Sequence, residues 1–192
     1  DVSINNKNDL SFLMDKFRIN GNLISSGNAS AQGLEFLLEK KRAENFYGHI
    51  GVTFFNATFR DLNGDIRDRD YNYRYIFNVV GGFRPKDKWE LSIRWSMFGG
   101  KPYTPIDNEL SNELQYEVLI ENKNNEERTP VYHSLFVRYD YRKNYNFGNL
   151  IGYMELWNAY NRENIEGYYW DGGIKKETYF NLIPVVGIEI EF

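Results

Sequence analysis

The sequence predicts an all-β fold, an antiparallel segment of a transmembrane β-barrel with about seven strands. Apolar and polar residues alternate with a period of two over several long stretches, as in strands whose two faces meet different surroundings. Short and long connections alternate between these stretches. The sequence also finishes on such a stretch, with Phe192 as its last residue. Together these three observations favour a membrane-spanning sheet over a soluble one.

The composition excludes several classes of protein. A mean hydropathy of −0.61, with no run of about 18 apolar residues, excludes a transmembrane helix. Barrel strands escape this test, because lipid-facing and inward-facing residues alternate along them. The net charge of −4 argues against a nucleic-acid partner. The absence of cysteine excludes disulfides and thiolate metal sites.

Seven strands are expected, in a region that covers residues 29–192, while residues 1–28 are expected to form a loop or a partial strand. Most of these strands have about ten residues or more, whereas soluble strands average about five or six and a tilted strand needs about nine to eleven to cross a bilayer. No α-helix is expected. The expected strands are residues 31–41, 46–59, 72–84, 89–99, 131–142, 149–160 and 178–192.

The alternation is clearest in residues 89–99. Apolar side chains occupy every second position there, and Glu90, Ser92 and Arg94 fall between them. The last strand repeats the pattern: Ile188, Ile190 and Phe192 share one face. We therefore expect one face of each strand to meet lipid and the other to meet the inside of a barrel.

The connections fall into two groups. Those at residues 41–45, 85–88 and 144–148 are short. Those at 60–70, 100–130 and 162–176 are long and polar. Because the two groups alternate along the chain, all long connections should lie at one end of the sheet, as in outer-membrane barrels.

Two motifs suggest chemistry but are better explained by structure. Asp61, Asp65, Asp68 and Asp70 lie in one loop, as in the start of a calcium site. The distal glutamate of such a site is missing and arginines intervene, which favours a solvated turn. His133 and Ser134 are adjacent in an expected strand, so their side chains should point to opposite faces and cannot form a base–nucleophile pair. We therefore expect no enzyme activity, no catalytic residues, no metal site and no cofactor.

Two clusters are candidate binding residues. Arg74, Arg94 and Arg138 are expected on the inward face, either to contact a ligand or to satisfy the polar inner wall. The loop aromatics Tyr168, Tyr169 and Trp170 could stack on a sugar ring or an iron chelate. The alternative for these aromatics is loop packing or anchoring at the membrane interface.

Several motifs, in this order, resemble the C-terminal end of the barrel of a TonB-dependent outer-membrane receptor. The segment Phe98-Gly99-Gly100-Lys101-Pro102-Tyr103-Thr104-Pro105 is similar to the family's "GxPYTP" loop and is the most specific of them. The segment after Thr129 departs from the family, since His133-Ser134 stands where arginine is usual and Val137 where an acid often lies. The resemblance covers about residues 28–192. The motifs are residues 28–35, 83–92, 98–105, 129–135, 154–161 and 187–192.

This resemblance implies a part of a transporter in the bacterial outer membrane. The family's barrel has 22 strands and an N-terminal plug, so these would be the last strands of a larger barrel. The family takes up a scarce substrate, such as a metal chelate, cobalamin or a glycan, using energy delivered by the TonB complex. Implied partners are outer-membrane lipid, the remaining strands and plug, and the barrel-assembly machinery, which would read Ile188, Ile190 and Phe192 as an insertion signal.

Two alternatives stay open. An eighth strand in residues 8–20 would complete an autonomous eight-stranded barrel, which could act as an adhesin or a structural anchor. A soluble β-sandwich or lipocalin-like carrier is the other, and it would not need detergent.

Overall fold

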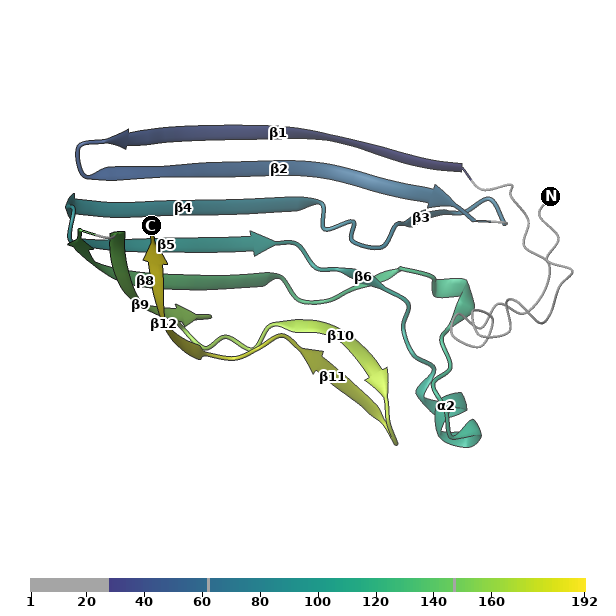
Figure 1. Ribbon diagram of the computed structural model, residues 1–192. Helices are drawn as coiled ribbons and strands as arrows, with labels where there is room; N and C mark the ends of the chain where they lie inside the picture. The colour runs from purple at the N-terminus through teal and green to yellow at the C-terminus, as the bar shows by residue number, and fades with distance from the viewer. Residues whose placement is uncertain (1–27, 62, 147) are drawn as a thin grey trace, which may run out of the picture.

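The computed structural model describes residues 28–192, apart from residues 62 and 147. The expected eighth strand at residues 8–20 lies outside the described residues. Seven long strands and one short strand form a single antiparallel sheet in the order β1-β2-β4-β5-β8-β9-β12, and β3 pairs with β2 (Figure 1). The long strands are β1 (Asn28–Ala43), β2 (Phe46–Arg60), β4 (Tyr75–Lys86), β5 (Trp89–Phe98), β8 (Tyr132–Tyr145), β9 (Gly148–Trp157) and β12 (Ile183–Glu191); β3 is Ile66–Asp68.

The prediction of a mostly β fold with one antiparallel sheet is confirmed, and each of the seven expected strands is present, with shifted ends. β4 begins at Tyr75 instead of residue 72, because Tyr71 and Arg74 have φ angles of 62° and 68°, which a strand cannot accommodate. β12 begins at Ile183 instead of residue 178. The backbone N–H of Leu182 donates to the side chain of Asn161 rather than to a neighbouring strand.

The described sheet is open. β1 and β12 are its edges, each paired on one side only, so the sheet does not close into a barrel. β9 and β12 curve away from the plane of β1, β2 and β4 (Figure 1).

The prediction that long and short connections separate is confirmed. The short turns after β1, β4 and β8 lie at one end of the sheet, and the long connections lie at the other (Figure 1). The first long loop (residues 61–74) contains β3. The second (residues 99–131) contains β6 (Pro102–Tyr103), α2 (Asn108–Leu114), a 3-10 turn (Glu121–Lys123) and β7 (Glu127–Arg128), and the third (residues 158–182) contains the hairpin β10 (Ile165–Trp170) and β11 (Ile174–Thr178).

The expectation of no helix is wrong for α2. The carboxylate of Asp107 caps this helix by accepting from the backbone N–H of Leu110 at 3.0 Å, and Gln115 ends it in a left-handed conformation. Seven residues are too few for a helical period to stand out in an Asn- and Glu-rich loop. In the part of the chain that the structure describes, no helix is long and apolar enough to span a membrane.

One face of the sheet is apolar and uncovered by any described residue. The strand register aligns Leu38, Ile50, Val79, Trp95 and Leu135 in one row across five strands. Leu38 is 71% exposed, and Val186 and Ile188 on β12 are 76% and 74% exposed. We call this the apolar face; its exposed members are Leu34, Phe36, Leu38, Phe46, Ile50, Phe54, Leu91, Ile93, Tyr139, Met154, Val186, Ile188 and Ile190.

The opposite face carries the polar residues, and we call it the polar face. A row three positions away from the apolar row aligns Tyr47, Gly82, Ser92, Arg138 and Glu155. The polar residues buried on this side include the fully buried Ser134 and Asp140, which is 8% exposed, and the apolar Ile151 is buried beside them.

Apolar burial is almost absent from the described residues. Ile106 and Ile151 are the two apolar residues of the described chain that are buried. The sheet is therefore inverted relative to a soluble domain, in which the apolar side chains fill the core.

Candidate functional site

Arg138 lies on the polar face in the middle of a network. Its guanidinium donates to both carboxylate oxygens of Asp140, at 2.7 to 3.1 Å, and lies 4.1 Å from the ring centre of Tyr153. A carboxylate oxygen of Glu189 lies 4.0 Å away. Because an acid and a ring already engage this guanidinium, the geometry favours its structural role in the wall over ligand contact.

The other two candidate arginines lie in different settings. Arg94 is on the polar face of β5, where its guanidinium stacks 4.2 Å from the ring centre of Phe136. Arg74 lies in the bend before β4 instead of on the strand, and pairs with Asp68 at 3.3 Å. The structure therefore does not bring the three arginines together as one site.

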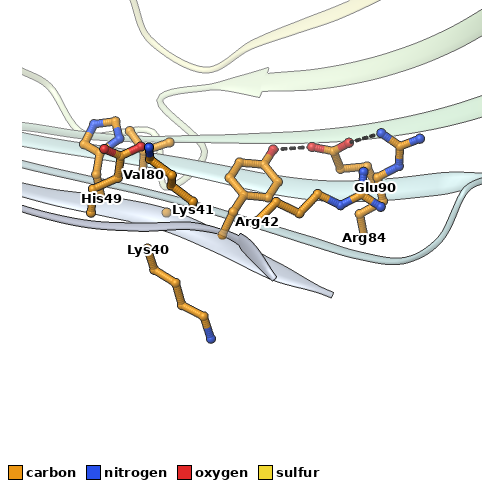
Figure 2. A pocket seen from close by; sticks show the side chains of 10 residues that line it. Lys40, Lys41, Arg42, His49, Val80, Arg84 and Glu90 are labelled. Atoms are coloured by element: carbon orange, nitrogen blue, oxygen red, sulfur yellow. Dashed lines mark hydrogen bonds and ion pairs between the residues drawn. The ribbon is translucent and has the colours of Figure 1, made fainter. Parts of the chain in front are cut away.

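A hollow of about 580 Å³ lies near the short turns (Figure 2). The hydroxyl of Tyr47 donates to Glu90, and Arg84 pairs with Glu90 at 3.9 Å and with Asp87 at 3.6 Å. Figure 2 shows Lys40 projecting away from His49, Glu90 and Arg84, as expected of a side chain on the opposite face. Glu90 and Arg84 are therefore engaged with neighbours on the same face, which favours a structural role for these two groups.

The aromatic residues of the third loop are less free than the sequence suggests. Trp170 donates its backbone N–H to Glu117 at 3.0 Å and its indole N–H to Asn112 at 3.1 Å. Tyr168 packs on Tyr103, with ring centres 5.0 Å apart. Tyr169 is 41% exposed. The hairpin β10–β11 is thus attached to the second loop, and Tyr169 is the most available ring of the three.

A polar network joins the first loop to the second. Arg128 pairs with Asp68 and donates to the carbonyl oxygens of Asn72 and Gly100 at 2.7 and 2.9 Å. The fully buried Asn72 donates its amide to Asp68 at 2.7 Å. Sequence reasoning considered Asp68 as a metal ligand, and it missed Arg128 as its partner because 60 positions separate the two residues.

The acidic loop is a turn whose carboxylates are already engaged. Desolvation opposes ionisation of Asp61, but hydrogen bonds from the backbone of Asp65 and the side chain of Arg67 outweigh it and lower its pKa. Arg67 also pairs with Asp65 at 3.3 Å. Among the described residues, no group of three or more potential ligands could hold a metal ion.

His133 and Ser134 do point to opposite faces of β8. The imidazole Nδ1 of His133 lies 2.6 Å from the hydroxyl of Tyr160, while Ser134 is fully buried opposite Ser96. The pair therefore has no geometry for nucleophilic catalysis.

An aromatic row that the sequence did not reveal lies at the loop end of the sheet. Ring centres are 4.8 Å apart for Tyr73 and Phe98, 4.2 Å for Phe98 and Tyr132, and 5.1 Å for Tyr132 and Tyr179. Desolvation, with the negative charge of Glu166 nearby, raises the pKa of Tyr179 to about 12. No periodicity could have found this row, because its members come from loops and strand ends.

The last strand presents the residues expected to guide insertion. Ile188 and Ile190 lie on the apolar face of β12 and are 74% and 49% exposed. Phe192 follows the strand and is 98% exposed.

Comparison with known proteins adds no family to this description. No protein-family model matches the chain, and no curated protein matches it significantly.

Proposed function

We propose that the chain forms part of a transmembrane β-barrel in the bacterial outer membrane, in a receptor of the TonB-dependent type. The observation that carries this proposal is the inverted sheet. Apolar side chains are exposed on one face, while the other face carries mostly polar side chains, of which Ser134 and Asp140 are buried. Exposed apolar side chains on six of the seven long strands are unfavourable in water and suit contact with lipid.

The open edges support a larger barrel. Among residues 28–192 that the structure describes, no strand pairs with the outer sides of β1 and β12. Each unpaired group costs several kcal/mol within a lipid core, so further strands must complete the pairing. The motifs at residues 98–105 and 187–192 favour a TonB-dependent receptor as the source of these strands. The proposed role is uptake of a scarce substrate, with a plug and the TonB complex as partners.

The facing of the strands can be tested by labelling single cysteines, since these 192 residues contain none and any cysteine elsewhere in the receptor can be replaced by serine. The full-length receptor carrying Ile93→Cys or Ser92→Cys is labelled with a fluorophore and placed in bilayers that contain brominated lipid. Lipid should quench the label at position 93 and leave the label at position 92 nearly unquenched. Equal quenching at both positions would overturn the proposed membrane orientation.

Cell fractionation tests whether the protein is an integral component of the outer membrane. The receptor should remain in the outer-membrane pellet after a salt wash and enter solution only with detergent. A soluble monomer without detergent would support the soluble carrier instead. A monodisperse 192-residue barrel in detergent would support the autonomous eight-stranded barrel.

A further inference from the structure

We infer that the cavity between the first and second long loops binds an oligosaccharide, with Tyr71 stacking on a pyranose ring. The cavity has a volume of about 510 Å³, which is within the range of about 300–1,000 Å³ typical of small-ligand sites. This inference rests on the proposed function, which places these loops outside the cell. The lining residues are Phe59, Arg69, Asp70, Tyr71, Asn124 and Asn125.

Tyr71 is held in an unfavourable conformation with its ring uncovered. Its φ angle of 62° is rare for a residue with a large side chain, and the residue is nevertheless 61% exposed. The ammonium of Lys101 lies 5.3 Å from the ring centre of Tyr71, and the ring centre of Tyr73 lies 6.2 Å from it. Such strain persists where the surroundings enforce it, and it is concentrated at ligand sites. An exposed tyrosine ring is also a common surface for stacking.

Asn125 fixes the polar side of the cavity. It is only 9% exposed, and its amide donates to the carbonyl oxygen of Asp68 at 2.9 Å and to the carboxylate Oδ1 of Asp70 at 2.8 Å. Its backbone N–H donates to the hydroxyl of Thr104 at 3.1 Å. Asp70 is thereby oriented before any ligand arrives, which lowers the entropic cost of binding.

Several polar groups of the cavity lack partners among the described residues. The Oδ2 atom of Asp70 and the guanidinium of Arg69 make no hydrogen bond or ion pair there, and Asn124 uses only its oxygen, which accepts from Thr104 at 3.2 Å. The cavity therefore offers an acceptor, an amide donor and a cationic donor beside an aromatic ring. Sugar hydroxyls both donate and accept, so a pyranose can satisfy all three.

The free oxygen of Asp70 favours a sugar over a ferric chelate. A catecholate or hydroxamate chelate presents mainly acceptor oxygens around the metal and often carries negative charge. Such a chelate could pair with Arg69, but Asp70 would face like charge and its free oxygen would find no donor, whereas a sugar satisfies both residues. The ion pair between Arg128 of the second loop and Asp68 of the first also holds the two loops that line the cavity in a fixed position relative to each other.

The test uses the full-length receptor purified in detergent and applied to an array of plant, algal and microbial oligosaccharides, followed by calorimetric titration with the strongest binder. Tyr71→Ala should weaken that binding about tenfold or more, and Asp70→Asn should weaken it as well. Tyr71→Phe should retain most of the affinity because stacking survives. Tyr169→Ala removes the exposed ring of β10, which is the rival stacking site. Tyr116→Ala, at a tyrosine of the second loop that is 48% exposed and outside the cavity lining, is the matched control and should bind as the parent does.

The variant Tyr71→Gly distinguishes loss of binding through misfolding from loss of binding through removal of the ring. Glycine accepts the positive φ without strain, so this variant should fold normally. This variant should unfold at the same or a higher temperature and still lose binding. Binding to no sugar on the array would overturn the inference, as would binding lost in Tyr169→Ala but kept in Tyr71→Ala. A ferric catecholate chelate that binds through Tyr71 where no sugar does would also overturn it. Each of these results can occur in a protein that passes the fractionation and quenching tests, so the membrane proposal stands or falls separately.

Discussion

The ring of Tyr47 on β2 lies directly over Gly82 on β4, its partner in the strand register. A Cβ atom at position 82 would lie 2.1 Å from Cζ of the tyrosine, so the ring needs a glycine beneath it. The hydroxyl then reaches Glu90 on β5. Tyr153 lies over Gly187 in the same way, with Cζ 2.4 Å from the position of a Cβ. Aromatic rings over glycines thus connect neighbouring strands on the polar face.

Gly82→Ala should destabilise the sheet. The added methyl group must displace the ring of Tyr47 and with it the hydrogen bond to Glu90, at a cost of about 1–3 kcal/mol. The measurement is the free energy of unfolding in urea for the full-length protein folded into lipid. Gly81→Ala is the matched control, because its Cβ would lie on the apolar face at 3.8 Å from the side chain of Ile93, an ordinary contact. An equal loss of unfolding free energy in Gly82→Ala and Gly81→Ala would show that the position of the Tyr47 ring does not require a glycine at position 82.

Ile93→Arg should destabilise the inserted protein far more than Ser92→Arg. Ile93 is on the apolar face, where an arginine near the middle of a membrane-spanning strand costs about 2–4 kcal/mol. Ser92 is on the polar face, opposite Gly82 and Arg138, where a new guanidinium can reach water and acids. A folding titration of both variants in lipid vesicles measures the difference. Comparable losses at the two positions would contradict the assignment of the faces.

Asp68→Asn should loosen the first two loops while leaving the sheet folded. Asp68 accepts from Asn72 and pairs with Arg74 and Arg128, so its charge serves three groups in a partly buried setting. Loss of that charge should cost about 1–3 kcal/mol locally, and proteolysis in residues 120–131 should accelerate about tenfold. The control is Asp65→Asn. Asp65 is 61% exposed and pairs only with Arg67, so cleavage should hardly change.

The strands and the loop lengths could be predicted because they follow from local alternation. Ile93 and Ser92 are neighbours in a strand and point to opposite faces, and this alternation of apolar and polar residues is visible in any ten-residue window. The prediction placed the start of β4 too early, since neither Tyr71 nor Arg74 belongs to a residue type that favours positive φ. The loop contacts were invisible for a different reason. Asp68 and Arg128, or Trp170 and Glu117, meet only after the strands bring their loops together, and no sequence period encodes such a meeting.

Raising the pH should weaken the third loop through Tyr179. This residue precedes β12 and packs on Tyr132, and its pKa is raised to about 12 by desolvation and by the nearby Tyr73 and Glu166. The folded state therefore holds the phenolic proton more tightly than the unfolded chain, in which tyrosine has a pKa of about 10. The contribution is complete below pH of about 10 and disappears as the pH rises toward about 12, since the unfolded state then loses the proton first.

Subtracting the ultraviolet titration curve of Tyr179→Phe from that of the parent isolates the ionisation of Tyr179, which should centre near pH 12. In the same variant the fall in stability between about pH 10 and 12 should be shallower. A difference titration centred near pH 10 would show that Tyr179 is solvated and that the aromatic row does not bury it.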